Sequence, residues 1–394
     1  MTEPTLRPPR PAPLALLAFG NFVIGMGAFV VIGTLVPIAD GLRLSKAEAG
    51  WVMTAYALSY AVASPVLVAL TGAISRRTVL TIGMVTFTLA AILCALAPNG
   101  LMLFLARALA AAGAGIYTPN AAAVAVATAA PEARGRALST VFAGLTLAQV
   151  TGVPVGAWVG YAHGWQAAFW IVGGLGTAAA IALALNVPGA VAFQPSSLRQ
   201  LGRTLLDPLA SLSILFTATF LAPIYIVYTY LGPLLEAKLG LGRDGVTMLL
   251  AIYGFGAVAG NVLSGRLVDR LGPYRALAIC VATQVVLLPM VSFASYPMAF
   301  GAMLMVAWSA SGWSFMAAQQ LRLVSLRKDG HNVLLALNAA CIYVGAAVGS
   351  AIGGAVLERG GLASLGLAAA GCMLIAGAHL VGTEWLRRRE TGRD

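Results

Sequence analysis

Hydrophobic residues gather into twelve long runs along the chain, separated by short polar gaps. The runs cover residues 14–38, 48–71, 78–97, 101–127, 137–161, 165–187, 208–234, 246–266, 274–294, 298–321, 332–357 and 363–386. A helix needs about 20 apolar residues to cross a bilayer, and each run meets that length. All 13 acidic residues fall in the gaps or at the run ends. The pattern predicts an all-α membrane protein with twelve transmembrane helices.

Composition and charge agree with a membrane protein rather than a soluble one. The chain is 60% hydrophobic and 9% charged, whereas soluble domains are about 25% charged. A net charge of +11 would favour a nucleic-acid partner in a soluble protein. Here the basic residues lie in loops that can face anionic lipid, so we expect membrane lipid and no nucleic acid as a partner.

The distribution of Lys and Arg predicts the orientation, because basic residues accumulate in cytoplasmic loops. With the N-terminus inside, the inner segments hold 18 of the 24 basic residues and a span holds Arg107. The outer loops hold the other five: Arg43, Lys46, Lys238, Arg243 and Arg359. Both termini are therefore expected in the cytoplasm.

The twelve predicted helices divide into two related halves. Residues 188–207 form the longest polar segment, so we expect halves at 1–187 and 208–394 with a cytoplasmic linker between them. One offset of 193 residues relates Gly72 to Gly265, Arg77 to Arg270 and Tyr60 to Tyr253. A constant offset is expected for two parallel six-helix repeats.

The same offset relates two glycine ladders in the fifth and eleventh helices. They are Gly152, Gly156 and Gly160 in the first half, and Gly345, Gly349 and Gly353 in the second. Small residues at every fourth position allow helix backbones to approach closely in a membrane. We expect the fifth and eleventh helices to pack tightly against a neighbour from the other half; static packing and a sliding surface both remain open as the role of the ladders.

Five local motifs resemble the major facilitator superfamily over essentially the full length of the chain. They are "GRLVDRLGPYR" from Gly265, "RALAAAGAGIYTPN" from Arg107, "PEARGRA" from Pro131, "GVPVGAWVGYAHGWQAAFW" from Gly152 and "GWSFMAAQQ" from Gly312. With "ALSYAVASPVLVAL" from Ala57, the set is most similar to the twelve-span bacterial drug, arabinose and purine efflux branch, and within it to purine base or nucleoside exporters.

The resemblance implies alternating access, in which two halves rock about a central cavity lined by the first, fourth, seventh and tenth helices. It also implies a monomer in a bacterial inner membrane. The motifs place gating residues at Gly265, Asp269, Arg270 and Arg275, and at Gly152, Pro154 and Gly156. In the family the Asp helps to hold the cytoplasmic gate closed, so we expect a latch of Asp269 with Arg270 and Arg275.

The chain departs from the family pattern in two places. The loop after the second helix has Arg76 where the repeat would put the partner of Asp269, so the first half should have only a weak latch. In the first helix, Gly27 or Ala28 stands where related pumps carry an embedded Glu. Proton-coupled carriers need an embedded titratable group. His163 and His379 are candidates for that group, but for both we favour the role of a polar cap over that of a proton relay.

Arg107 is the one charged residue away from the ends of a run, about 9 Å from the outer end of its helix at 1.5 Å per residue. It either faces the cavity, where it binds substrate or modulates coupling, or is a structural residue bonded to backbone carbonyls. The other candidate substrate-binding residues are neutral: Asn21, Tyr117, Asn120, Gln149, Tyr225, Tyr228, Trp313, Gln319 and Asn338. Amides and aromatic rings suit a neutral, planar, hydrogen-bonding solute.

The sequence therefore predicts a transporter that exports a drug-like or purine-like solute in exchange for protons. An uncoupled facilitator and a small organic-anion carrier that uses Arg107 remain as alternatives. We find no pairing of nucleophile and base, no metal-ligand cluster and no phosphate loop, so neither an enzyme nor a cofactor is expected.

Overall fold

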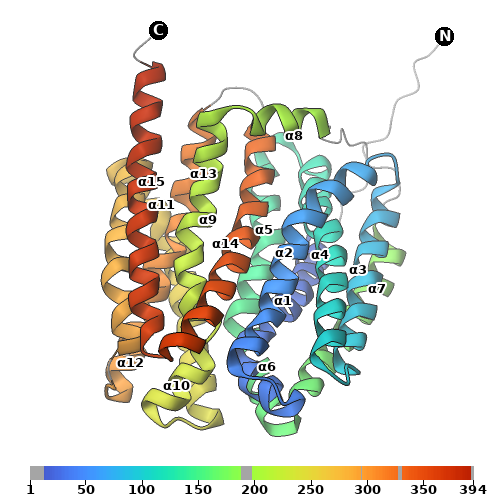
Figure 1. Ribbon diagram of the computed structural model, residues 1–394. Helices are drawn as coiled ribbons and strands as arrows, with labels where there is room; N and C mark the ends of the chain where they lie inside the picture. Colours follow the sequence, from blue (N-terminus) through green and yellow to red (C-terminus); the bar gives the residue numbers. More distant parts are fainter. Residues whose placement is uncertain (1–12, 188–197, 294, 327–330, 392–394) are drawn as a thin grey trace, which may run out of the picture.

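The computed structural model describes residues 13–187, 198–293, 295–326 and 331–391, and it is built from helices packed side by side (Figure 1). The start of α1 (Leu14–Leu42) and the end of α15 (Ser364–Thr391) lie at one end of the bundle, together with the short helix α8 (Leu198–Leu205) (Figure 1). We call this end the termini side and the other end, where α6 (Val153–His163) and α10 (Leu231–Leu239) lie, the opposite side.

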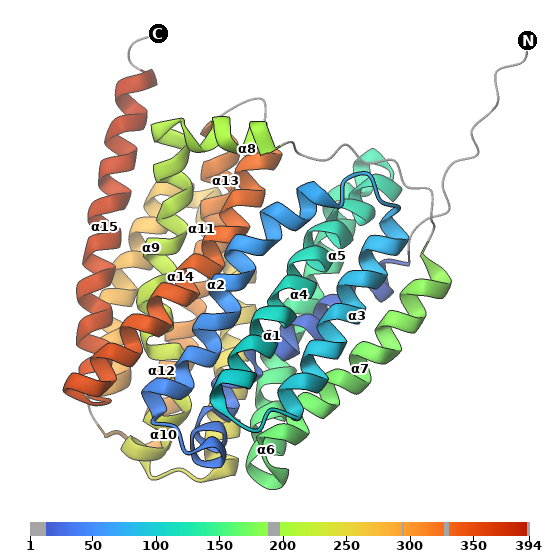
Figure 2. The same ribbon diagram turned by 45° about the vertical axis from the view of Figure 1, so that its right-hand side comes forward.

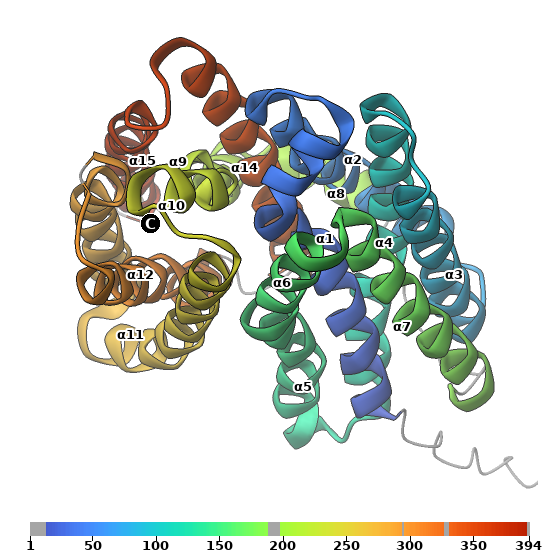
Figure 3. The same ribbon diagram turned by 90° about the horizontal axis from the view of Figure 1, so that it is seen from below.

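The helices fall into two groups that stand next to each other when the bundle is seen along its axis (Figure 3). The first half holds α1 (Leu14–Leu42), α2 (Lys46–Leu70), α3 (Arg76–Ala95), α4 (Gly100–Thr128), α5 (Arg134–Leu147), α6 (Val153–His163) and α7 (Trp165–Asn186). The second half holds α9 (Pro208–Tyr228), α10 (Leu231–Leu239), α11 (Arg243–Phe293), α12 (Met298–Trp313), α13 (Phe315–Leu326), α14 (His331–Gly360) and α15 (Ser364–Thr391). Within the predicted linker, α8 (Leu198–Leu205) is helical, and residues 188–197 lie outside the described residues.

Ten helical spans in the described part of the chain are long and apolar enough to cross a membrane. One of them, α11, has 51 residues and is broken at Gly272, where a φ of 75° ends one crossing before Pro273 begins the next. The helices α12 and α13 together make another crossing, bent at Ser314. Because α11 makes two crossings and α12 with α13 makes one more, the ten spans become the twelve crossings that the sequence predicted.

Proline explains the interruption of the fifth crossing. Pro154 has no N–H to donate to the carbonyl four residues earlier, and the turn before it, Ala148–Gly152 (η2), widens into a π-helix between α5 and α6. Short π turns often mark functional positions in helices. This one lies at the contact between the halves, since a Cβ on Gly254 of α11 would stand 2.6 Å from the Cα of Val150.

The fifth and eleventh helices both contact the other half, as expected, but their glycine ladders face the other way. In the fifth crossing, Gly152 and Gly160 face Met26 and Thr34 of α1, whose side chains would stand 3.1 Å and 2.6 Å from a Cβ added at each glycine. In α14, Gly345 faces the carbonyl of Ala218 in α9, which would stand 2.9 Å from such a Cβ. Each ladder therefore joins the fifth helix to the first helix of its own half, and the two halves repeat this packing.

The halves meet through other surfaces, which lie between the middle of the bundle and the opposite side. Helices α2 and α14 lie side by side (Figure 2), and the rings of Tyr60 and Tyr343 stack at 3.7 Å between them. Nearer the opposite side, the Tyr161 hydroxyl donates a hydrogen bond of 2.6 Å to Glu236. The structure is therefore joined across its halves on the side away from the termini.

Candidate functional site

Arg107 is enclosed by protein, with 1% of its surface exposed. Its Nη1 and Nη2 donate to the carbonyls of Gly27 and Ala28 at 2.5 Å and 2.8 Å, and its Nε donates to the carbonyl of Val52 at 3.4 Å. The guanidinium also lies over the ring of Tyr56, 4.3 Å from its centroid. Of the two roles considered for Arg107, these contacts match the structural one, bonded to backbone carbonyls, and they tie α4 to α1 and α2.

The polar candidate residues of the first half form hydrogen bonds with other side chains and with backbone carbonyls of the protein. Asn21 donates to the carbonyl of Val141 in α5 at 3.0 Å and accepts from Thr118 of α4 at 3.0 Å. Tyr117 donates to the carbonyl of Leu17 at 3.1 Å. These bonds hold α1, α4 and α5 together.

Asn120 has a partner from the termini side of the bundle. Arg76, buried at the start of α3, donates to the side-chain oxygen of Asn120 at 2.5 Å and to the carbonyl of Gly72 at 2.8 Å. Arg76, which stands where the repeat would put the partner of Asp269, thus anchors α3 to α4.

The second half contains a matching polar cluster. Gln319 of α13 donates to the carbonyl of Ser213 at 2.7 Å and to the hydroxyl of Thr217 at 3.1 Å, and Thr217 donates to Asn338 of α14. The cluster joins the first, fourth and fifth helices of its half, as in the first half. Asn21, Gln319 and Asn338 therefore lie in two clusters that join corresponding helices of the two halves.

Aromatic side chains form a third group where the halves meet, which we call the central aromatic cluster. Tyr228 and Tyr253 stack at 4.4 Å, and Trp308 meets Tyr253 edge-on at 4.9 Å. Across the contact between the halves, Tyr343 stacks on Tyr60 at 3.7 Å. All members are buried: Tyr56, Tyr60, Tyr225, Tyr228, Tyr253, Trp308 and Tyr343.

Two donors of this cluster have no hydrogen-bond partner among the described residues: the Tyr56 hydroxyl and the Trp308 indole N–H. Buried polar groups are usually satisfied, and one left unpaired costs about 1–3 kcal/mol. Each of these two groups would donate a hydrogen bond to an acceptor that a bound solute brought to it.

Sequence reasoning placed Tyr225 and Tyr228 in this region but missed Tyr56, Tyr60, Tyr253 and Tyr343. A signal was present, because the 193-residue offset relates Tyr60 to Tyr253, and each stacks on a tyrosine of the second half. Of the remaining candidates, Trp313 is half-buried and lies close to Tyr253 of the cluster. Gln149 lies in the π turn.

The expected latch is not formed in this structure. Asp269 and Arg270 are exposed, as is Arg275, and none of them makes an ion pair with a described residue. Gly265 has open space where a Cβ would stand. These residues lie on the termini side, where the described residues show no direct hydrogen bond between the halves.

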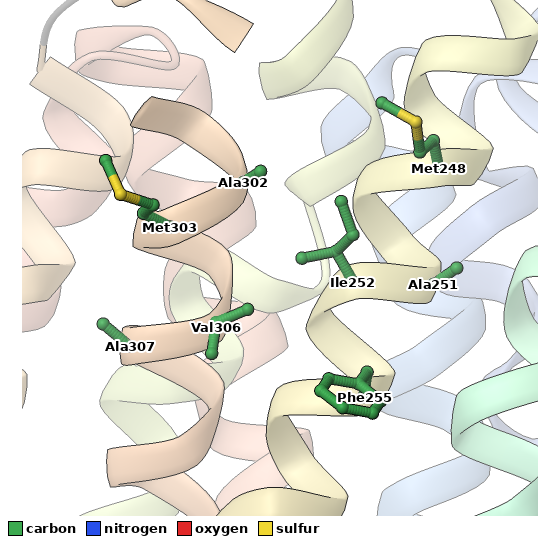
Figure 4. A pocket seen from close by; sticks show the side chains of 8 residues that line it. All are labelled: Met248, Ala251, Ile252, Phe255, Ala302, Met303, Val306 and Ala307. Atoms are coloured by element: carbon green, nitrogen blue, oxygen red, sulfur yellow. The ribbon is translucent and has the colours of Figure 1, made fainter. Parts of the chain in front are cut away.

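A lateral groove of about 700 Å³ lies between α11 and α12 (Figure 4), and no member of the central aromatic cluster lines it. Its eight lining side chains are all apolar, among them Met248, Phe255 and Met303 (Figure 4). The groove offers no group that would orient a polar solute, so acyl chains suit it better.

Acidic side chains are absent from the middle of the described bundle. The one acid buried among the described residues is Glu384, which is paired with Arg387 near the end of α15. His163 is exposed, and half-buried His379 is bonded to Thr219 at 2.9 Å. The charge of Arg107 therefore has no acid partner within the described residues.

Comparison with known proteins gives matches over nearly the whole chain. Residues 17–329 and 220–394 match the Major Facilitator Superfamily model. The inner membrane transport protein YdhP of Escherichia coli is 30% identical over 88% of this chain and 89% of its own length. The uncharacterized transporter YtbD of Bacillus subtilis, of the same superfamily type, is 31% identical over 96% of both chains.

Solved structures share the fold at low sequence identity. A bacterial homologue of the human lysosomal transporter Spinster, inward-facing and unoccupied, aligns with a TM-score of 0.71 at 18% identity over 94% of this chain and 95% of that one. The nucleoside transporter NupG aligns with a TM-score of 0.74 at 12% identity over 94% and 98%. With twelve crossings in two related halves and a family match from end to end, the chain belongs to the Major Facilitator Superfamily and is a membrane transporter of small molecules, not an enzyme.

Proposed function

We propose that the protein exports a small, neutral, planar solute of the drug or purine base and nucleoside type, in exchange for protons. The observation that carries this proposal is the central aromatic cluster. It joins the two halves through the stacked pair Tyr60 and Tyr343 and leaves the Tyr56 and Trp308 donors without partners among the described residues. A flat solute with acceptors at its edge matches those groups.

The orientation and direction rest on charge and on the contacts between the halves. Most Lys and Arg residues fall on the termini side, which favours a cytoplasmic termini side in a bacterial inner membrane, as the name of the YdhP relative also indicates. The halves are joined toward the opposite side, so the structure would be open toward the cytoplasm, that is, inward-facing. The exposure of Asp269 agrees with a cytoplasmic gate that is open.

The lack of an acid near the central aromatic cluster, among the described residues, favours a second candidate, an uncoupled facilitator for the same solutes. An organic-anion carrier is less well supported, because the Arg107 guanidinium already donates to three carbonyls and has 1% of its surface exposed.

A flux experiment on the purified protein in liposomes tests these candidates. The panel would contain purine bases, nucleosides, drugs and small carboxylates, with and without an imposed pH gradient. Uphill movement of a neutral solute against protons supports exchange, movement without protons supports the facilitator, and transport of carboxylates alone would contradict the proposed solute class.

Variants of Tyr343 link the flux to the central aromatic cluster. Tyr343→Ala should lower the flux on the order of tenfold, because stacking on one aromatic side chain is worth about 1–3 kcal/mol. Tyr343→Phe should keep most of it. The matched control is Tyr296→Ala, between α11 and α12 and outside the cluster; equal fluxes in Tyr343→Ala and the control would remove the cluster from the solute path.

A further inference from the structure

A second cavity, polar and about 280 Å³ in volume, lies on the termini side within the second half. It is lined by the break in α11, the end of α13 and the end of α15, three helices that lie side by side (Figure 1). Four arginines and one acid line it: Arg275, Arg322, Arg387, Arg388 and Glu384. No described residue of the first half takes part, so the cavity is separate from the contact between the halves.

Arg322 of α13 is buried in the wall of this cavity, with 3% of its surface exposed. Its Nη2 donates to the hydroxyl of Thr383 at 2.5 Å, whereas its Nε and Nη1 have no hydrogen-bond partner among the described residues. A buried charge with unpaired donors is costly. A bound anion would accept from both nitrogens.

Glu384 also lines the cavity but does not satisfy Arg322. Its two carboxylate oxygens accept from Arg387 at 2.9 Å and 2.7 Å, and one of them accepts from Arg388 at 3.2 Å. Glu384 is therefore engaged by these two arginines and leaves the Nε and Nη1 of Arg322 unpaired among the described residues.

The break in α11 adds a further feature that favours an anion. Gly272, with a φ of 75°, turns the chain, and Pro273 begins a new helix from the cavity wall. The first N–H groups of a helix have no partner within it, and its dipole is positive at this end. Helix N-termini bind phosphate groups for this reason.

We propose that this cavity binds a phosphate group, carried by an anionic phospholipid or by free phosphate. Its volume is below the roughly 300–1,000 Å³ of pockets for drug-sized ligands, so it fits a headgroup better than a whole drug. The guanidinium fork of Arg322 suits phosphate oxygens. Trp385, half-exposed on α15 under Arg389, is the kind of residue that marks the headgroup level.

Thermal unfolding of the full-length protein in a nonionic detergent tests the proposal. The probes are dioctanoyl phosphatidylglycerol, dioctanoyl phosphatidylcholine and inorganic phosphate, each titrated to saturation. The variants are Arg322→Gln, Arg275→Gln at the rim in case the first does not fold, and Arg136→Gln as a matched control at an exposed position of the first half.

We expect saturable stabilisation by the anionic lipid or by phosphate, weakened at least tenfold in Arg322→Gln and about threefold in Arg275→Gln. The control should bind within twofold of the wild type. Stabilisation by phosphatidylglycerol alone identifies the lipid as the source, and stabilisation by inorganic phosphate identifies the free anion. Equal stabilisation by phosphatidylcholine, no saturable binding, or unchanged binding in both cavity variants would overturn the proposal.

Discussion

Arg107 shows at the residue scale how a charge is held inside a membrane protein without an acid among the described residues around it. Three carbonyls from α1 and α2 and the ring of Tyr56 surround its guanidinium. Two of those carbonyls belong to Gly27 and Ala28. The charge thus lies against the backbones of α1 and α2, so we expect it to govern how α4 moves relative to these two helices.

Replacing Arg107 with methionine separates a structural from a functional role. The thioether side chain fills similar space and removes the buried charge with its desolvation cost, so the unfolding midpoint should change by no more than a few degrees. Transport should fall below about a tenth of the wild-type rate, because each 1.4 kcal/mol lost is a factor of ten. Flux in liposomes at matched protein density is the measurement, with Arg136→Met as the exposed control; wild-type flux in Arg107→Met would remove Arg107 from the mechanism.

At the scale of elements, each half is held by the close approach of its fifth helix to its first. Gly349 of α14 lies against the carbonyl of Ala222, and a Cβ there would stand 2.8 Å from the Cβ of Tyr225. Lipid gives no hydrophobic drive between helices, so this close packing supplies the attraction. The same contact positions Tyr225 of the central aromatic cluster.

Valine at position 349 should therefore destabilise the second half. Its added methyl groups would overpack the contact of α14 with α9, at a cost of about 1–3 kcal/mol. The matched control is Gly371→Val on the exposed face of α15, where a Cβ meets nothing within 4 Å. The measurement is the thermal unfolding midpoint of each variant at the same scan rate. A midpoint for Gly349→Val as high as that of Gly371→Val would contradict the close packing of α14 against α9.

Particular features explain what the sequence could and could not predict. The crossings were predictable because run length and polarity are local properties of the chain. The ladder spacing at Gly152 and Gly345 predicted a flat face but not its neighbour, since a pattern on one helix does not encode which helix it meets. The partners of Arg107 were hidden for a similar reason: every residue offers a carbonyl, so backbone acceptors leave no signature in the sequence.

The whole molecule is a pair of symmetrical halves joined toward the opposite side, and the central claim is that they must separate there for transport. Ala47 of α2 and Gly354 of α14 face each other across this contact, with 3.9 Å between the Cβ of Ala47 and a Cβ placed at position 354. That spacing lies within the range for a disulfide. A cross-link between cysteines at these positions would hold the opposite side closed.

The most direct test is transport by the Ala47→Cys, Gly354→Cys variant, made without the four native cysteines, before and after oxidation. A control pair at Thr34 and Gly160 lies within the first half, with 3.4 Å between the corresponding Cβ positions. Oxidation should abolish transport in the first variant and leave it in the control, and reduction should restore it. Full transport with the 47–354 cross-link formed would contradict alternating access.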